Sequence, residues 1–263
     1  MRRRALVATI GAMAFAIVFM AAAAPNAPAH AAHLPSPVDA LRVASLAERI
    51  VKLHAQIAQG ILAPRGRRAL ETALRELDRD VRALGMPPPP SELHERVAIL
   101  AILAGQYRTW ALRNPGRDVS AALAERAEEV EWEARRIAEL VPAPAGSEEA
   151  LAVKAVAAGA DAEHIARLLL WERWRIAPAA AGDDVARAKA ALQRSLDELA
   201  AAPQTDSATR AELQVAQNQA SFLFAASWSG EGARASLEYA VKASDNARES
   251  LERLAALYEK MGR

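Results

Sequence analysis

The sequence contains no cysteine among its 263 residues. This absence excludes a disulfide, a lipidated cysteine and a covalently attached haem. Metal-binding patterns are also missing, because His54, His94 and His164 fall on different predicted helices and no Glu-x-x-His pair accompanies them. Neither a Ser-His-Asp grouping nor a glycine-rich phosphate loop stands out. We therefore expect a protein that is not an enzyme and that holds no metal and no cofactor.

An excess of positive charge is lacking as well. When the N-terminal arginines Arg2, Arg3 and Arg4 are set aside, 30 basic and 32 acidic residues remain. A nucleic-acid partner usually requires a basic face, so we expect none. After the N-terminal segment no apolar run is long enough to cross a bilayer.

Residues 1–31 have the layout of a secretory signal peptide. The three arginines precede an apolar run from Ala5 to Ala24, and Ala29-His30-Ala31 matches a small-residue cleavage site. This pattern predicts a periplasmic or secreted protein. The apolar run is longer than in most signal peptides, so an uncleaved membrane anchor is the alternative.

Apolar residues of the remaining chain recur every three or four positions, which predicts amphipathic helices and no strands. Ser36 is expected to cap the first helix, and Gly85 to end the second. The apolar faces of four such helices are buried against one another when the helices form an up-down bundle. We therefore predict an all-α fold of two tandem antiparallel four-helix bundles, at 36–142 and 147–262, separated by a Pro-Ala-Pro-Ala-Gly segment from Pro142 to Gly146.

The two predicted halves are related in sequence. The segment Ala47-Glu48-Arg49-Ile50 matches Ala162-Glu163-His164-Ile165 at an offset of 115 residues. Further pairs follow in the same order, and collinear matches of this kind favour an internal duplication. They are Leu77 with Leu192, Val81 with Leu196, Leu84 with Leu199, Ala63-Pro64 with Ala177-Pro178, Trp110 with Trp228 and Val141 with Tyr258.

The repeated segment resembles the periplasmic domain of nitrate/nitrite sensors, in the version called the type IV pili methyl-accepting chemotaxis transducer N-terminal domain. Leu46-Ala47-Glu48-Arg49-Ile50-Val51-Lys52 stands where that family has L-S-Q-R-M-A-K. The resemblance implies a four-helix bundle whose dimers bind a small anion between paired first helices. Ala44 and Gly159 occupy the position of the family's main anion-binding arginine. If this is a sensor domain, we expect it to lack its own transmitter.

Four side chains near the repeated segment are candidate ligands for an anion: Arg49, Lys52, His164 and Arg167. A guanidinium suits a planar oxyanion because its donors form a fork, but a flanking arginine is more often ion-paired or solvated. Asp161 falls on the apolar stripe, one turn before His164, where a structural pair is the expected explanation.

Aromatic residues of the second half could form a packed cluster or a groove for a partner helix. They are Trp171, Trp174, Phe222, Phe224 and Trp228.

The sequence leaves two candidate functions. The first is a sensory module without its own transmitter, which binds a small anion and acts through an envelope protein. The second is a structural or adaptor protein that binds other envelope proteins. A homodimer is compatible with either.

Overall fold

The computed structural model describes residues 35–86, 91–175, 181–226 and 232–262. Helices dominate these ranges, and no strand occurs in them, which confirms the predicted all-α fold. The signal peptide, the prolines at 87–90, Ala177-Pro178 and Trp228 lie outside the described residues. The helices are α1 (Pro37–Ala58), α2 (Ala63–Leu84), α3 (Ser91–Ala111), α4 (Arg117–Leu140), α5 (Glu148–Trp174), α6 (Ala181–Ala201), α7 (Ser207–Ala225) and α8 (Ala233–Met261).

The helix ends follow local capping chemistry. Ser36 caps α1 as predicted, because its hydroxyl accepts the backbone N–H of Asp39. Ser147 caps α5 in the same way, and Asp206 caps α7 through the N–H of Thr209. Gly85 lies at the C-cap of α2, so the predicted stop is confirmed.

Each helix packs against a small set of neighbours. Within the first half α1 contacts α2 and α4, and α3 contacts α2 and α4. The second half repeats this order, since α5 contacts α6 and α8, and α7 contacts α6 and α8. Each half has its own apolar core, one built mainly from α1–α4 and the other mainly from α5–α8.

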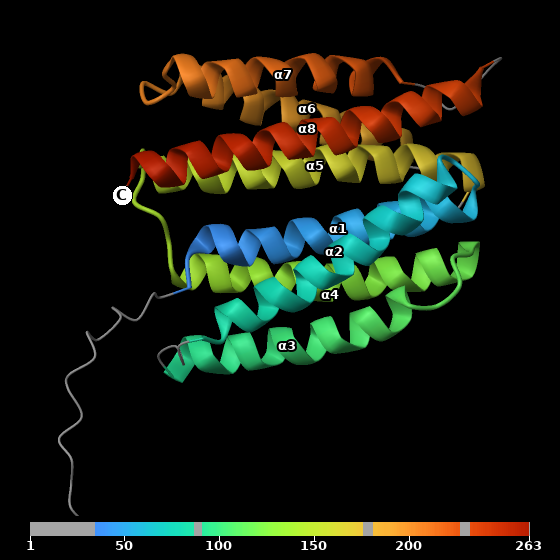
Figure 1. Cartoon of the computed structure of the whole chain (residues 1–263), viewed down its shortest axis with the longest axis horizontal. Coiled ribbons are helices and arrows are strands. Elements are labelled where there is room, and N and C mark those ends of the chain that lie inside the picture. The colour runs from blue at the N-terminus through green and yellow to red at the C-terminus, as the bar shows by residue number, and fades with distance from the viewer. Residues whose placement is uncertain (1–34, 87–90, 176–180, 227–231, 263) are drawn as a thin grey trace, which may run out of the picture. The chain divides into compact units, whose positions relative to one another are not determined.

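The two halves meet through α1 and α5, which pack along each other (Figure 1). Both helices run in the same direction, so that Gln59, just after α1, donates a hydrogen bond to the carbonyl of Leu170 near the end of α5. Gly146 lies in the loop between α4 and α5 with φ of 73°, a conformation that favours glycine. No helix continues across Gly146, because α4 ends before this loop and α5 begins after it. Through the α1–α5 contact the helices α1 to α8 form one compact unit within residues 34–263.

Buried positions correspond between the halves at nearly constant spacing. On α1 and α5 the spacing is 115 residues, and it pairs Ala47 with Ala162 and Ile50 with Ile165, all fully buried. On α3 and α7 it is 116 residues, and on α4 and α8 it is 117, with each pair buried on both helices. Examples are Val97 with Leu213, Ala104 with Ala220, Leu123 with Ala240, Ala134 with Leu251 and Ile137 with Leu254.

The predicted aromatic cluster of the second half is only partly formed. Trp171, Trp174 and Phe224 pack against the core of that half. Phe222 does not join them, because it lies on the outer face of α7 with 62% of its surface exposed. Within the described ranges no helix combines the length and the apolar character needed to cross a membrane.

Candidate functional site

The contact between α1 and α5 contains buried charges. The ammonium of Lys52 lies 2.6 Å from a carboxylate oxygen of Glu163 and 2.6 Å from one of Asp245 on α8. Lys52 and Glu163 have no exposed surface. Burial alone would raise the pKa of Asp245, but Lys52, followed by Arg49 and Arg65, holds that pKa below its usual value. This cluster is therefore an ionised network inside the protein.

A second cluster lies on the other side of the same contact. Arg167 donates to Glu48 over 2.5 Å, and its guanidinium lies 2.8 Å from Nδ1 of His164. Burial would raise the pKa of Glu48, but Arg167 and His164 outweigh it and lower that pKa to about 2. The guanidinium of Arg167 also stacks over the ring of Trp171, 4.5 Å from its centroid.

The two clusters are reciprocal. Glu163 and Arg167 lie 115 residues after Glu48 and Lys52, respectively. Glu48 of the first half pairs with Arg167 of the second, and Lys52 of the first half pairs with Glu163 of the second. Such an exchange of equivalent partners is the contact pattern of a two-fold symmetric dimer.

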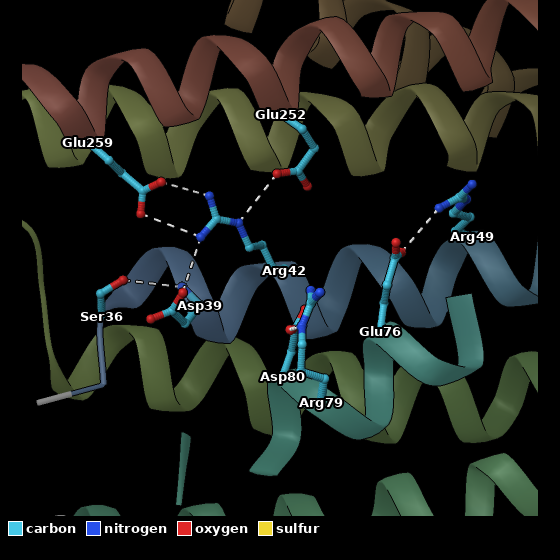
Figure 2. Close-up of polar contacts among 9 residues, drawn as sticks. All are labelled: Ser36, Asp39, Arg42, Arg49, Glu76, Arg79, Asp80, Glu252 and Glu259. Atoms are coloured by element: carbon cyan, nitrogen blue, oxygen red, sulfur yellow. Dashed lines mark hydrogen bonds and ion pairs between the residues drawn. The ribbon is translucent and has the colours of Figure 1, made fainter. Parts of the chain in front are cut away.

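All four predicted site residues thus lie at the α1–α5 contact, divided between the two clusters. Each of them lies beside a carboxylate. Arg49 forms an ion pair with Glu76 (Figure 2) at 3.5 Å, and it lies 3.9 Å from Glu163. Because internal carboxylates already face these cations, an added anion would have to compete with them for Arg49 and Lys52.

Ala44 and Gly159, which stand at the arginine position of the resembling family, lie where helices pack closely. Ala44 is buried in the first core. A Cβ atom built on Gly159 would lie 3.4 Å from Cγ of Arg248 and 3.8 Å from Cβ of Leu251 on α8. A long side chain at position 159 would therefore compete with Arg248 and Leu251 for the space beside α8.

The second cluster contains an additional acid. Glu131 on α4 lies next to Glu48, and burial together with this neighbouring carboxylate raises the pKa of Glu131 to about 8. At the equivalent position of the other half, 117 residues later, stands Arg248, whose Nε is 3.4 Å from Glu163. One cluster is therefore rich in cations, whereas in the other the raised pKa of Glu131 keeps its carboxyl group protonated near neutral pH beside Glu48.

A cleft of about 550 Å³ opens beside the second cluster, between α5, α6 and α4. His164 and Arg167 form part of its wall, so two of the four predicted residues reach this cleft. Asp161 also lines it, and burial raises the pKa of this carboxyl to about 6 against the opposing effects of His164 and Arg135. The remaining lining residues are Glu128, Leu168, Trp171, Asp184, Arg187, Ala188, Ala191 and Arg194.

A smaller groove of about 210 Å³ lies between α1, α2 and α8, and Arg42, which lines it, forms internal ion pairs (Figure 2). Arg42 bonds Glu259 over 2.8 Å and contacts Glu252 and Asp39. Burial would lower the pKa of Arg42, but these three carboxylates raise it above its usual value. Arg42 therefore joins the two halves structurally and is not left available to a ligand.

The sequence contained one signal for the carboxylates that prediction missed. Glu48 and Glu163 are the same residue at equivalent positions of the repeated segment, and both are buried. Arg187 and Arg194 gave no such signal, because they are exposed residues of α6. No group of three metal-ligating side chains occurs among the residues that the structure describes. Comparison with family models, curated proteins and solved structures finds no match.

Proposed function

We propose that this protein is an exported ligand-binding module that holds a small anionic or zwitterionic solute in the α5–α6 cleft. The observation that carries the proposal is the convergence of His164, Arg167, Arg194 and Asp161 on one cleft next to Trp171. A volume of about 550 Å³ lies within the range of small-molecule sites, and perturbed carboxyl groups gather at such sites.

The cleft offers complementary chemistry to such a solute. Arg167 pairs with Glu48, and Arg187 pairs with Asp184. Arg194 is exposed on α6, and its positive charge acts on the carboxyl group of Asp161 by lowering its pKa. An acidic group of the ligand would be bound by Arg194 and His164, and a cationic group by Asp161. The indole of Trp171 supplies an apolar wall.

The architecture supports a sensory role. We infer that each half is a four-helix bundle, that the halves arose by duplication, and that α1 and α5 are their paired first helices. The resemblance to nitrate and pilus-chemotaxis sensors implies such a pairing between two chains, whereas here two segments of one chain exchange reciprocal ion pairs. Residues 1–31 would direct the protein to the periplasm, where an envelope partner would receive the signal.

Thermal melting tests the proposal. A solute that binds only the folded state stabilises it, by about 2.7 kcal/mol at a hundredfold excess over its dissociation constant. Nitrate, nitrite, small carboxylates and amino acids are the probes. We expect at least one to raise the melting temperature, with the shift lost in Arg194→Ala. Arg79→Ala is the matched control, because Arg79 is the equivalent exposed residue of α2, 115 positions earlier. No shift with any probe would refute the proposal.

A further inference from the structure

Helix α3 exposes an apolar surface. Its outer face carries Ala98, Ile99, Ala101 and Ile102, of which Ile99 is 40% and Ile102 61% exposed. Trp132 on the adjacent helix α4 is 57% exposed and extends this surface. Together with the half-buried Leu103 these residues form what we call the α3–α4 face. A surface helix normally turns polar residues to water, so this face requires an explanation.

The second half shows that the fold does not require this face. At the positions of α7 that correspond to Ala98, Ala101 and Ile102, the sequence has Gln214, Gln217 and Asn218. Ile99 corresponds to Val215, which is also apolar and 42% exposed. The buried positions of the same two helices remain apolar in both halves, as Val97 with Leu213 and Ala104 with Ala220 show. The two repeats therefore share their core, and three outward positions that are apolar on α3 are polar on α7.

The same comparison applies to α4. Trp132 corresponds to Glu249 of α8, which is exposed and charged. Trp132 and Ile99 line one groove, and neither belongs to an apolar core. Apolar surface of this kind is favourable only when a partner covers it.

Acidic side chains border the face. Between α3 and α4 lies a groove of about 510 Å³ lined by Ile99, Leu103 and Trp132 and by four glutamates. Glu125, Glu128 and Glu129 are exposed, and Glu133 is buried beside Arg96. No lysine or arginine lines this groove. At the positions of α8 that correspond to Glu125 and Glu129, the sequence has Lys242 and Asn246, so the acidic border is also specific to the first half.

We propose that the α3–α4 face binds a basic amphipathic helix of a partner protein. Apolar side chains of that helix, spaced by three and four residues, would cover Ile99, Ile102 and Trp132. Its lysines or arginines would meet Glu125 and Glu129 at the border. An anionic bilayer does not fit, because these glutamates would be repelled by its surface charge. The inference goes beyond the proposed solute binding and does not depend on it.

The test uses an 18-residue peptide of leucine and lysine with helical amphipathic spacing, labelled with a fluorophore, and follows its anisotropy during titration with the protein. The same peptide with glutamate in place of lysine is the charge control. Ile102→Asn, Trp132→Glu and Glu125→Lys each introduce the residue that the other half has at the equivalent position. Phe222→Gln is the matched control, because it removes a 62% exposed aromatic of α7 and introduces the residue that α3 has there.

We expect the leucine–lysine peptide to bind and the leucine–glutamate peptide to fail. Binding should weaken at least tenfold in Ile102→Asn, in Trp132→Glu and in Glu125→Lys, and should be unchanged in Phe222→Gln. Weakening in Trp132→Glu is decisive, because this substitution adds negative charge while it removes the apolar contact. Melting curves of the variants should overlay that of the parent protein, since the second half accepts these residues.

Three results would overturn the proposal. The first is no binding of the leucine–lysine peptide. The second is binding that persists unchanged in Trp132→Glu, which would indicate attraction to charge alone. The third is self-association, seen by light scattering and lost in Ile102→Asn, which would identify a second copy of this chain as the occupant.

Discussion

The carboxyl group of Glu131 should make the folded state less stable as pH rises. Its pKa is about 8 in the fold, against 4.5 in an unfolded chain, because the half-buried group is partly desolvated and lies next to Glu48. Between these two pH values the folded protein therefore binds more protons than the unfolded one, and the free energy of unfolding falls. The other charged groups around Glu131 are Arg167 and Arg135, which moderate the effect.

Glu131→Gln removes this titration and keeps a neutral hydrogen-bonding group next to Glu48. Each pKa unit corresponds to about 1.4 kcal/mol, so the full difference is at most about 5 kcal/mol. Coupled titration with Glu48 reduces this figure. We expect Glu131→Gln to gain about 2–4 kcal/mol relative to the parent protein between pH 5 and pH 8. Asp161 titrates in both proteins and cancels from the comparison.

Urea unfolding at pH 5, 6, 7 and 8 at constant ionic strength measures this difference. Glu129→Gln is the control, since Glu129 is an exposed residue two positions earlier on the same helix. Its free energy of unfolding should follow that of the parent protein at every pH. Equal pH dependence of Glu131→Gln and the parent would refute the raised pKa of Glu131 beside Glu48.

Four further substitutions test contacts of α1 and the cap of α5 by urea unfolding. Lys52→Met removes the ammonium that lies 2.6 Å from Glu163 and 2.6 Å from Asp245, and leaves Glu163 only the more distant Arg248 and Arg49. It should cost about 3–5 kcal/mol, and a loss below about 1 kcal/mol would contradict a buried network of ion pairs. Tyr107→Phe removes a 2.7 Å hydrogen bond to the carbonyl of Ala47 and should cost about 1 kcal/mol, and an unchanged midpoint would show that water replaces it. Ser147→Ala removes the cap of α5 and should cost about 1 kcal/mol, whereas Ser147→Asp should retain most of it.

Hydrophobic periodicity predicted the helices because the buried apolar residues of each helix recur every three or four positions within that helix. Leu77, Val81 and Leu84 are spaced by three and four residues and lie in the first core. The ends at Ser36 and Gly85 were predictable for the same reason, since capping depends on one or two neighbouring residues.

The contact between α1 and α5 was not predictable from such patterns. Both helices bury a second face that contains charged residues, and a stripe analysis assigns charged residues to solvent. Lys52 and Glu163 are 111 residues apart, and neither one specifies the other from its own surroundings. Among the charged residues of this contact, the glutamates Glu48 and Glu163 were the sequence indication that the two segments are equivalent. The cleft is lined by residues of α4, α5 and α6, so it exists only once α5 packs against the first half. For this reason the sequence alone did not indicate that Arg187 and Arg194 line a cleft.

Calorimetric titration with the solute that most raises the melting temperature tests the ligand-binding proposal most directly. The parent protein and Arg194→Ala are compared, with Arg79→Ala as the control from the equivalent helix of the first half. The proposal predicts one binding site in the parent and in Arg79→Ala, and at least tenfold weaker binding in Arg194→Ala. Equal dissociation constants in all three proteins would contradict a site in the α5–α6 cleft.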